Sequence, residues 1–102
     1  MLLKKNYAEG DVVTFKLVNG DEILARILAT NTDSWTITKP LTLESREKGL
    51  GLLQTVMSMD INDPAELQKS SVMIHAATVK ELADHYIRTT TETSPEKDMS
   101  GE

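Results

Sequence analysis

The sequence predicts a small, mostly β domain: a strongly bent, five-stranded antiparallel barrel followed by one C-terminal α-helix. Three observations lead to this fold class. A hairpin signal, Asn19-Gly20, joins two apolar runs near the N-terminus. The second of these runs is apolar on both faces, which is typical of a strand that bends through a barrel core. Near the C-terminus, the apolar residues change to helical spacing.

The first two strands are predicted within residues 12–28. Apolar and polar side chains alternate in the first strand, with Val13, Phe15 and Leu17 on one face and Thr14 and Lys16 on the other. Asn and Gly both tolerate positive φ, so we expect a two-residue type I′ turn between the strands. Both faces of the second strand are apolar, with Ile23, Ala25 and Ile27 alternating with Leu24 and Leu28.

The third strand is expected to begin at Trp35 and to follow an alternating pattern through residue 38. Pro40 restricts its regular pairing to an edge or a bulge, and Leu41 and Leu43 can extend it further. Residues 44–49 form a charged loop. Residues 50–59 then give a fourth strand.

Two helix starts follow. Asp63 is a capping residue with Pro64 at the first helical position and Glu66 three residues after the cap, so a short helix is predicted there. Residues 72–76 are the fifth strand. The capping box that runs from Thr78 to Glu81 opens a helix over 79–89. Its apolar stripe comprises Val79, Leu82, Ala83, Tyr86 and Ile87.

Charge and composition divide the chain into a folded domain, residues 1–88 with the helix at its end, and a polar tail. Residues 89–102 carry a net charge of −3 out of −5 and are almost devoid of apolar side chains, so we expect an acidic, disordered tail. The remaining 10 basic and 12 acidic residues give the body only −2. This balance disfavours phosphate-dominated nucleic-acid binding but leaves open binding through base stacking and base edges.

Several function classes lack their usual signals. The chain has no cysteine, so disulfides and thiolate metal sites are excluded. No apolar run is long enough to cross a membrane, and we expect a soluble, cytoplasmic protein. The two histidines, His75 and His85, belong to no catalytic motif. We therefore expect neither an enzyme nor a metal or cofactor site.

Three segments together resemble the Sm-like family, especially its bacterial host-factor RNA-chaperone branch. Residues 13–27, VTFKLVNGDEILARI, look like its first motif, a strand, a Leu-Val-Asn-Gly turn and a sharply bent strand. Residues 33–37, DSWTI, resemble the loop and third-strand start that frame a base-binding pocket in that branch. Residues 72–79, VMIHAATV, are similar to its second motif, in which a His-Ala pair closes the pocket.

The resemblance implies a bent barrel whose fourth strand pairs with the fifth strand of the next copy, closing a ring of six or seven subunits. Family rings bind single-stranded, uridine- or adenine-rich RNA without a cofactor, and no DNA specificity is expected. By this likeness Trp35 would stack on a base and His75 would hydrogen-bond a base or phosphate. Ser34 would add a polar contact and Asp33 would orient the loop. Divergent chains of this kind look like those that phages encode, which would place the protein in the host cytoplasm.

The sequence departs from the family pattern at several places. Ala25 replaces the glycine at the bend, and Ile74 replaces the basic residue that precedes the histidine. On the opposite ring face, Lys16 and Leu24 stand where an aromatic residue and a polar reader are usual. The loop before residue 33 is longer, the segment 60–71 is an insertion, and the helix is C-terminal instead of N-terminal.

Two hypotheses therefore remain. In the first, the chain is a ring-forming Sm-like protein that binds single-stranded RNA near its pore. In the second, the same ring is a non-enzymatic assembly or protein-interaction module, which the acidic balance and Ile74 favour. Residue by residue, Trp35 is also a candidate core or interface anchor, and His75 a candidate structural residue on a strand.

Overall fold

The computed structural model describes residues 7–92, with the backbone alone at residue 92. Its elements, in chain order, are β1 (Val12–Leu17), β2 (Glu22–Thr30), β3 (Ser34–Arg46), β4 (Gly49–Gln54), β5 (Ala65–Gln68), the 3-10 turn η1 (Lys69–Ser71), β6 (Val72–Ala77) and α1 (Lys80–Glu92). The mostly β class with one C-terminal helix is confirmed. The helix predicted over 79–89 is α1, which runs from Lys80 to Glu92 and so enters the segment predicted as a disordered tail; residues 93–102 lie outside the described residues.

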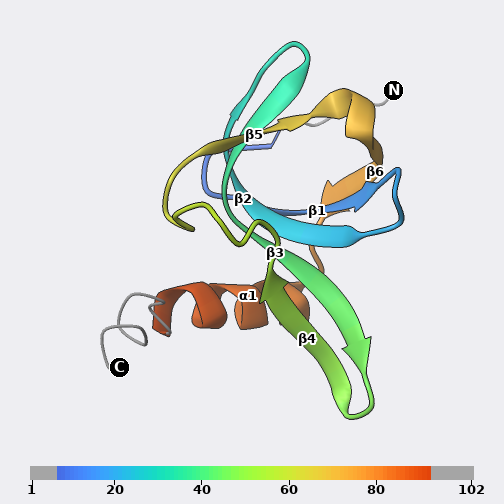
Figure 1. Cartoon of the computed structure of the whole chain (residues 1–102). Coiled ribbons are helices and arrows are strands. Elements are labelled where there is room, and N and C mark those ends of the chain that lie inside the picture. The colour runs from blue at the N-terminus through green and yellow to red at the C-terminus, as the bar shows by residue number, and fades with distance from the viewer. Residues whose placement is uncertain (1–6, 93–102) are drawn as a thin grey trace.

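The strands form one antiparallel sheet in the order β4-β3-β2-β1-β6, and β5 also pairs with β3. The long strand β3 carries β5 along its first four residues and β4 along residues 41–46. In Figure 1 the sheet curls, so that β1, β2, β5 and β6 surround a common interior. Over residues 7–92 no pairing joins β4 to β6, and the sheet is not closed.

The β1–β2 turn differs from the predicted type I′ turn. Only Gly20 has positive φ, at +100°, whereas Asn19 does not. The N–H of Gly20 donates to the Leu17 carbonyl at 2.9 Å, and the N–H of Leu17 donates to the Asp21 carbonyl at 2.8 Å. This pattern is a three-residue hairpin, a type I turn followed by a left-handed glycine. The Asn19 side-chain oxygen accepts from the N–H of Asp21 and supports the turn.

Strand β3 continues through Pro40. This agrees with the prediction that the proline would lie at an edge or a bulge. In the pairing with β2 the register shifts between Leu24 and Arg26, opposite Lys39 and Pro40. Lys39 has φ +51°, a left-handed backbone conformation that residues other than glycine rarely adopt. A bulge of this kind tolerates the missing N–H of proline and bends the strand at the same time.

The prediction for residues 55–71 is wrong in two respects. The fourth strand ends at Gln54 instead of reaching residue 59. The side-chain amide of Gln54 donates to the carbonyls of Val56 and Met59 in the following loop. The expected helix after Asp63 is the strand β5. Ala65 and Leu67 pack on the core while their backbone pairs with β3, so tertiary pairing overrides the local capping signal.

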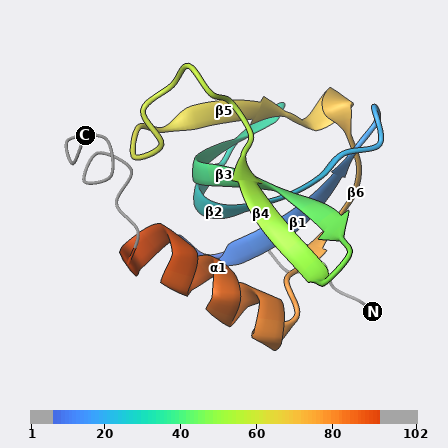
Figure 2. The same cartoon turned by 60° about the horizontal axis from the view of Figure 1, so that its bottom comes forward.

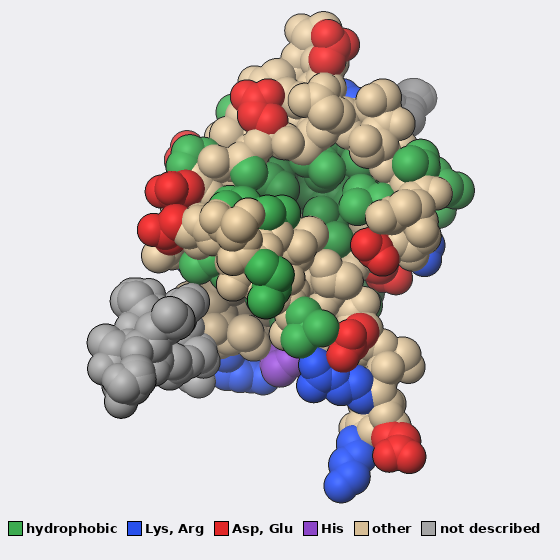
Figure 3. Space-filling model, in the orientation of Figure 1, with side chains coloured by type: hydrophobic (Ala, Val, Ile, Leu, Met, Phe, Trp, Pro, Cys, Tyr) green, Lys and Arg blue, Asp and Glu red, His purple; other side chains and the backbone are tan. Residues whose placement is uncertain are grey.

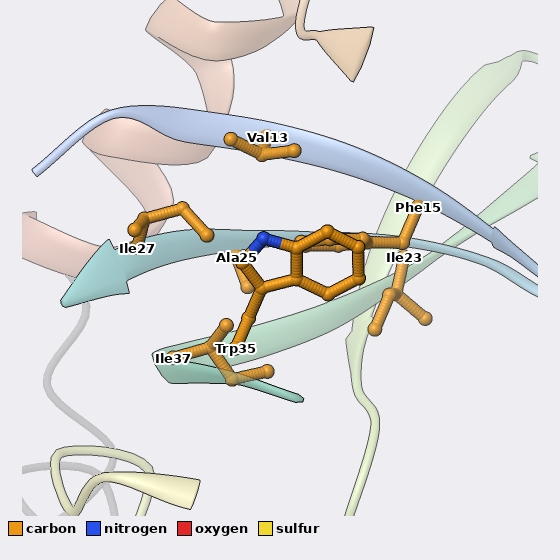
Figure 4. Packing of buried hydrophobic residues seen from close by; sticks show 7 residues of the cluster. All are labelled: Val13, Phe15, Ile23, Ala25, Ile27, Trp35 and Ile37. Atoms are coloured by element: carbon orange, nitrogen blue, oxygen red, sulfur yellow. The ribbon is translucent and has the colours of Figure 1, made fainter. Parts of the chain in front are cut away.

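The core inside the curled sheet consists of side chains from β1, β2 and β3: Val13, Phe15, Ile23, Ala25, Ile27, Trp35 and Ile37. Figure 4 shows the Trp35 indole at the centre of this cluster. On the face seen in Figure 3, hydrophobic side chains line the bottom of a hollow between β5 and the β1–β2 pair. The seven side chains of the core itself are at most 4% exposed.

A second cluster lies between the outer face of the sheet and α1. It contains Leu24, Leu41 and Tyr86, all buried, with Leu82 packed against them. Figure 2 shows α1 lying along the outside of the sheet. The prediction that β2 is buried on both faces is confirmed, and the cover on its outer face is the helix of the same chain.

Candidate functional site

A hollow of about 890 Å³ lies between β6, the β2–β3 hairpin and the segment before β1. We call it the His75 hollow. It is lined by Tyr7, Ala8, Asp11, Thr30, Trp35, Lys69, Val72, Met73, His75 and Ala77. Among the sequence-predicted site residues, Trp35 and His75 both line it, although they are 40 positions apart in the chain. Aromatic and polar groups thus meet at one opening of the sheet.

Four aromatic rings form a row from the core to the surface. Phe15 and Trp35 have ring centroids 5.0 Å apart, and the His75 ring follows at 4.9 Å in an edge arrangement. Tyr7 comes last, 5.7 Å from His75 and nearly perpendicular to it. Such tilted and edge contacts are favourable geometries for aromatic pairs. The row fixes His75 against the core and leaves its ring at the mouth of the hollow.

Trp35 itself is only 4% exposed. Phe15 contacts it from the core, and the Lys69 ammonium lies 5.1 Å from its ring centroid, within reach of a cation–π interaction. This burial agrees with the alternative prediction that Trp35 is an anchor of the core. In the present arrangement, a ligand in the hollow meets the rings of His75 and Tyr7 before it meets Trp35.

His75 is exposed on β6 and points to the same side as the buried Phe15, its partner across the β1–β6 pairing. Its Nδ1 lies 2.7 Å from the Tyr7 hydroxyl oxygen. Partial burial raises the pKa of the Tyr7 phenol, so this hydroxyl keeps its proton across the neutral range. The imidazole is therefore held by one well-defined hydrogen bond.

Tyr7 was not among the predicted site residues, because nothing in its sequence surroundings marks it. A β-turn over residues 8–11 places it: the N–H of Asp11 donates to the Ala8 carbonyl, and the Asp11 carboxylate accepts from the N–H of Ala8 at 2.8 Å. Gly10 takes φ +96° in this turn. The only available sequence signal was the Gly10-Asp11 pair, a common turn dipeptide.

Ser34 and Asp33 have structural partners. The buried Ser34 hydroxyl donates to the Glu66 carboxylate at 3.1 Å and accepts from the Asn31 amide at 3.1 Å. The Asp33 carbonyl accepts from the N–H of Lys69, which ties the β2–β3 loop to η1. Asp33 and Ser34 therefore shape the wall that carries Trp35, and neither lines the His75 hollow.

The charges around the hollow are few. Lys69 is the one cation among its lining residues and Asp11 the one anion. The arrangement therefore offers an ammonium, an exposed imidazole, the partly exposed ring of Tyr7 and the nearly buried ring of Trp35, without the cationic cluster that dominates phosphate binding. Its chemistry suits a flat, partly apolar ligand with hydrogen-bonding groups on its edge.

Both ends of the sheet are open edges within residues 7–92, since β4 pairs only with β3 and β6 only with β1. Large apolar side chains are exposed at both: Leu50 and Leu53 on β4, and Met73 and Ile74 on β6. Val56 and Met57, just after β4, and Val79, just after β6, are exposed as well. Unpaired, apolar strand edges are surfaces on which another chain can pair.

In the described part of the chain, no three His, Asp or Glu side chains come together as a metal site would require. The helix there is too short and too polar to cross a bilayer. No protein-family model matches the chain, and no curated protein matches it.

Proposed function

We propose that the chain is a ring-forming Sm-like protein that binds single-stranded RNA at the His75 hollow. The observation that carries the proposal is the meeting of Trp35, His75, Tyr7 and Lys69 at one opening of a curled sheet, beside β6, which within residues 7–92 pairs on one side only. Stacking and edge hydrogen bonds supply affinity at such a site without a large positive charge.

The strand order supports the Sm-like barrel. Strands β4 and β5 both pair antiparallel with β3, one after the other along its length. The sheet has six strands, and we interpret β4 and β5 as two pieces of one fourth strand, interrupted by residues 55–64. On this interpretation β6 would be the fifth strand of the proposed barrel, with η1 between the last two.

The open edges support assembly. Strand β4 stands at one end of the sheet and β6 at the other, so a β4 edge of one copy can pair with the β6 edge of the next. A head-to-tail contact of this kind repeats from copy to copy and closes a ring when the rotation permits. It would also cover the apolar side chains that both edges expose.

A protein-interaction module is the second candidate. It is favoured by the near-complete burial of Trp35 and by the single cation lining the hollow. In that case the same ring would use its apolar loop residues, such as Val56 and Met57, to bind a protein.

RNA binding is tested with labelled oligo-U and oligo-A at low and moderate salt. We expect micromolar or tighter binding by the wild type and a loss of about tenfold in His75→Ala, because one polar contact contributes up to about 1.5 kcal/mol. His85→Ala, which changes the other histidine on α1, is the matched control and should bind normally. Absence of binding at low salt would move the assignment to the interaction module.

Assembly is tested by light scattering. The N–H of Thr78 donates to the Val12 carbonyl, so ladder alternation directs the N–H of Ala77 away from β1, toward the open edge. Ala77→Pro removes this outward donor, and we expect a smaller particle than the wild type gives. Ala77→Val keeps the N–H and should assemble normally. A monomeric wild type would contradict the ring.

A further inference from the structure

The hydrogen bond between Tyr7 and His75 determines what the hollow presents to a ligand. A neutral imidazole has one N–H donor and one bare nitrogen acceptor, and the partner of one nitrogen decides the role of the other. The Tyr7 oxygen lies 2.7 Å from Nδ1, and within residues 7–92 the ring makes no other hydrogen bond. Its Nε2 therefore remains available at the mouth of the hollow.

The direction of this hydrogen bond follows from the two groups. A phenol oxygen shares its lone pairs with the ring and accepts weakly, whereas its hydrogen is a good donor. A bare imidazole nitrogen is a strong acceptor. The favoured arrangement has the Tyr7 hydroxyl donating to Nδ1, which puts the histidine proton on Nε2.

We propose that Tyr7 is a positioning residue that holds His75 in the Nε2–H form, so that the hollow selects ligands by an acceptor oxygen. Lys69 lines the same hollow and is also a donor without acceptor capacity. Two donors favour a keto oxygen of a base or a phosphate oxygen over an exocyclic amino group. The selectivity for an RNA ligand rests on the proposed function. The position of the proton on His75 does not, because it follows from the hydrogen bond to Tyr7 alone.

The proton position is read from long-range ¹H–¹⁵N spectra of the full chain at about pH 8.5, where an ordinary imidazole is neutral. With only two histidines, His85→Gln assigns the signals of His75. We expect the Nε2–H pattern in the wild type and a mixture of both forms in Tyr7→Phe, which keeps the ring but loses the hydroxyl. Tyr86→Phe removes the other tyrosine hydroxyl of the chain and should leave His75 unchanged.

An Nδ1–H pattern in the wild type, or an unchanged pattern in Tyr7→Phe, would overturn the inference. The ligand side is measured with oligo-U, oligo-A and an abasic ribose-phosphate oligomer. We expect Tyr7→Phe to bind oligo-U about three- to tenfold more weakly and to change oligo-A less. An equal loss for all three oligomers assigns the acceptor to phosphate, and a loss for oligo-U alone assigns it to the base. Wild type that binds none of them, yet shows the Nε2–H pattern, would refute RNA binding and leave the role of Tyr7 standing.

Discussion

Tyr86 links α1 to the sheet through its hydroxyl group. Removing this hydroxyl gives a prediction about stability that has two parts. Its side chain is fully buried, and its hydroxyl donates to the Lys39 carbonyl at 2.6 Å, with the Thr38 carbonyl at 3.3 Å. Both carbonyls belong to the bulge of β3. Tyr86→Phe keeps the packing of the ring and removes this anchor alone.

The magnitude follows from the burial. The lost hydrogen bond and the orphaned Lys39 carbonyl together cost about 1–3 kcal/mol. For a domain of this size each kcal/mol lowers the melting temperature by about 4–8 °C, so a loss near 2 kcal/mol corresponds to about 8–16 °C. Thermal and urea unfolding, followed by far-ultraviolet circular dichroism and the fluorescence of the single tryptophan, measure it.

The second part is the response to alkaline pH. Burial raises the pKa of Tyr86 far above the usual value, and the nearby Arg26 offsets only part of that rise. The native state therefore keeps the phenol proton while the unfolded chain loses it above about pH 10, so stability falls as the pH rises, by up to about 1.4 kcal/mol per pH unit. Tyr86→Phe lacks this loss. Its deficit relative to the wild type should shrink between pH 9 and pH 11, and a deficit that stays constant over that range would refute the buried anchor.

Three further substitutions probe other parts of the fold. Gly20→Ala meets no neighbouring atom but forces φ +100° on a side chain, and should cost about 1 kcal/mol in urea unfolding. Ser34→Ala loses the bond to Glu66 and should lower stability by about 1 kcal/mol while leaving oligo-U affinity unchanged; an affinity loss at full stability would instead give Ser34 a ligand contact. Leu24→Ala removes a fully buried side chain beneath α1, and should cost about 2–5 kcal/mol and speed hydrogen exchange in the helix.

The sequence was most informative where a periodic pattern ran for several residues. The alternation in β1, the two apolar faces of β2 and the helical stripe each correspond to an observed element. The stripe is only partly buried, because Val79 and Ile87 at its ends stay exposed while Leu82 and Tyr86 pack. Periodicity thus located the elements, and the packing decided which of their residues became core.

Sequence reasoning failed where a local signal competed with a distant partner. The Asp63-Pro64 cap is a valid helix start, but the next residues gain more by pairing with β3 and packing the partly buried Leu67 against the core. The same limit applies to the site. The resemblance to the Sm-like family predicted that Trp35 and His75 lie at one site. Tyr7 lies 68 residues from His75, and only the folded structure places it in the hollow.

The structure also shows which apolar surface a single chain covers by itself. The outer face of β2, which the sequence predicted to be apolar, is covered by α1 of the same chain. The apolar side chains that stay exposed include those at the β4 and β6 edges. Assembly and folding should therefore separate: Ala77→Pro is expected to give a smaller particle that still unfolds in one cooperative transition, since both hydrophobic clusters form within one chain. A variant that dissociates and loses its cooperative transition together would show that the edges, and not α1, complete the core.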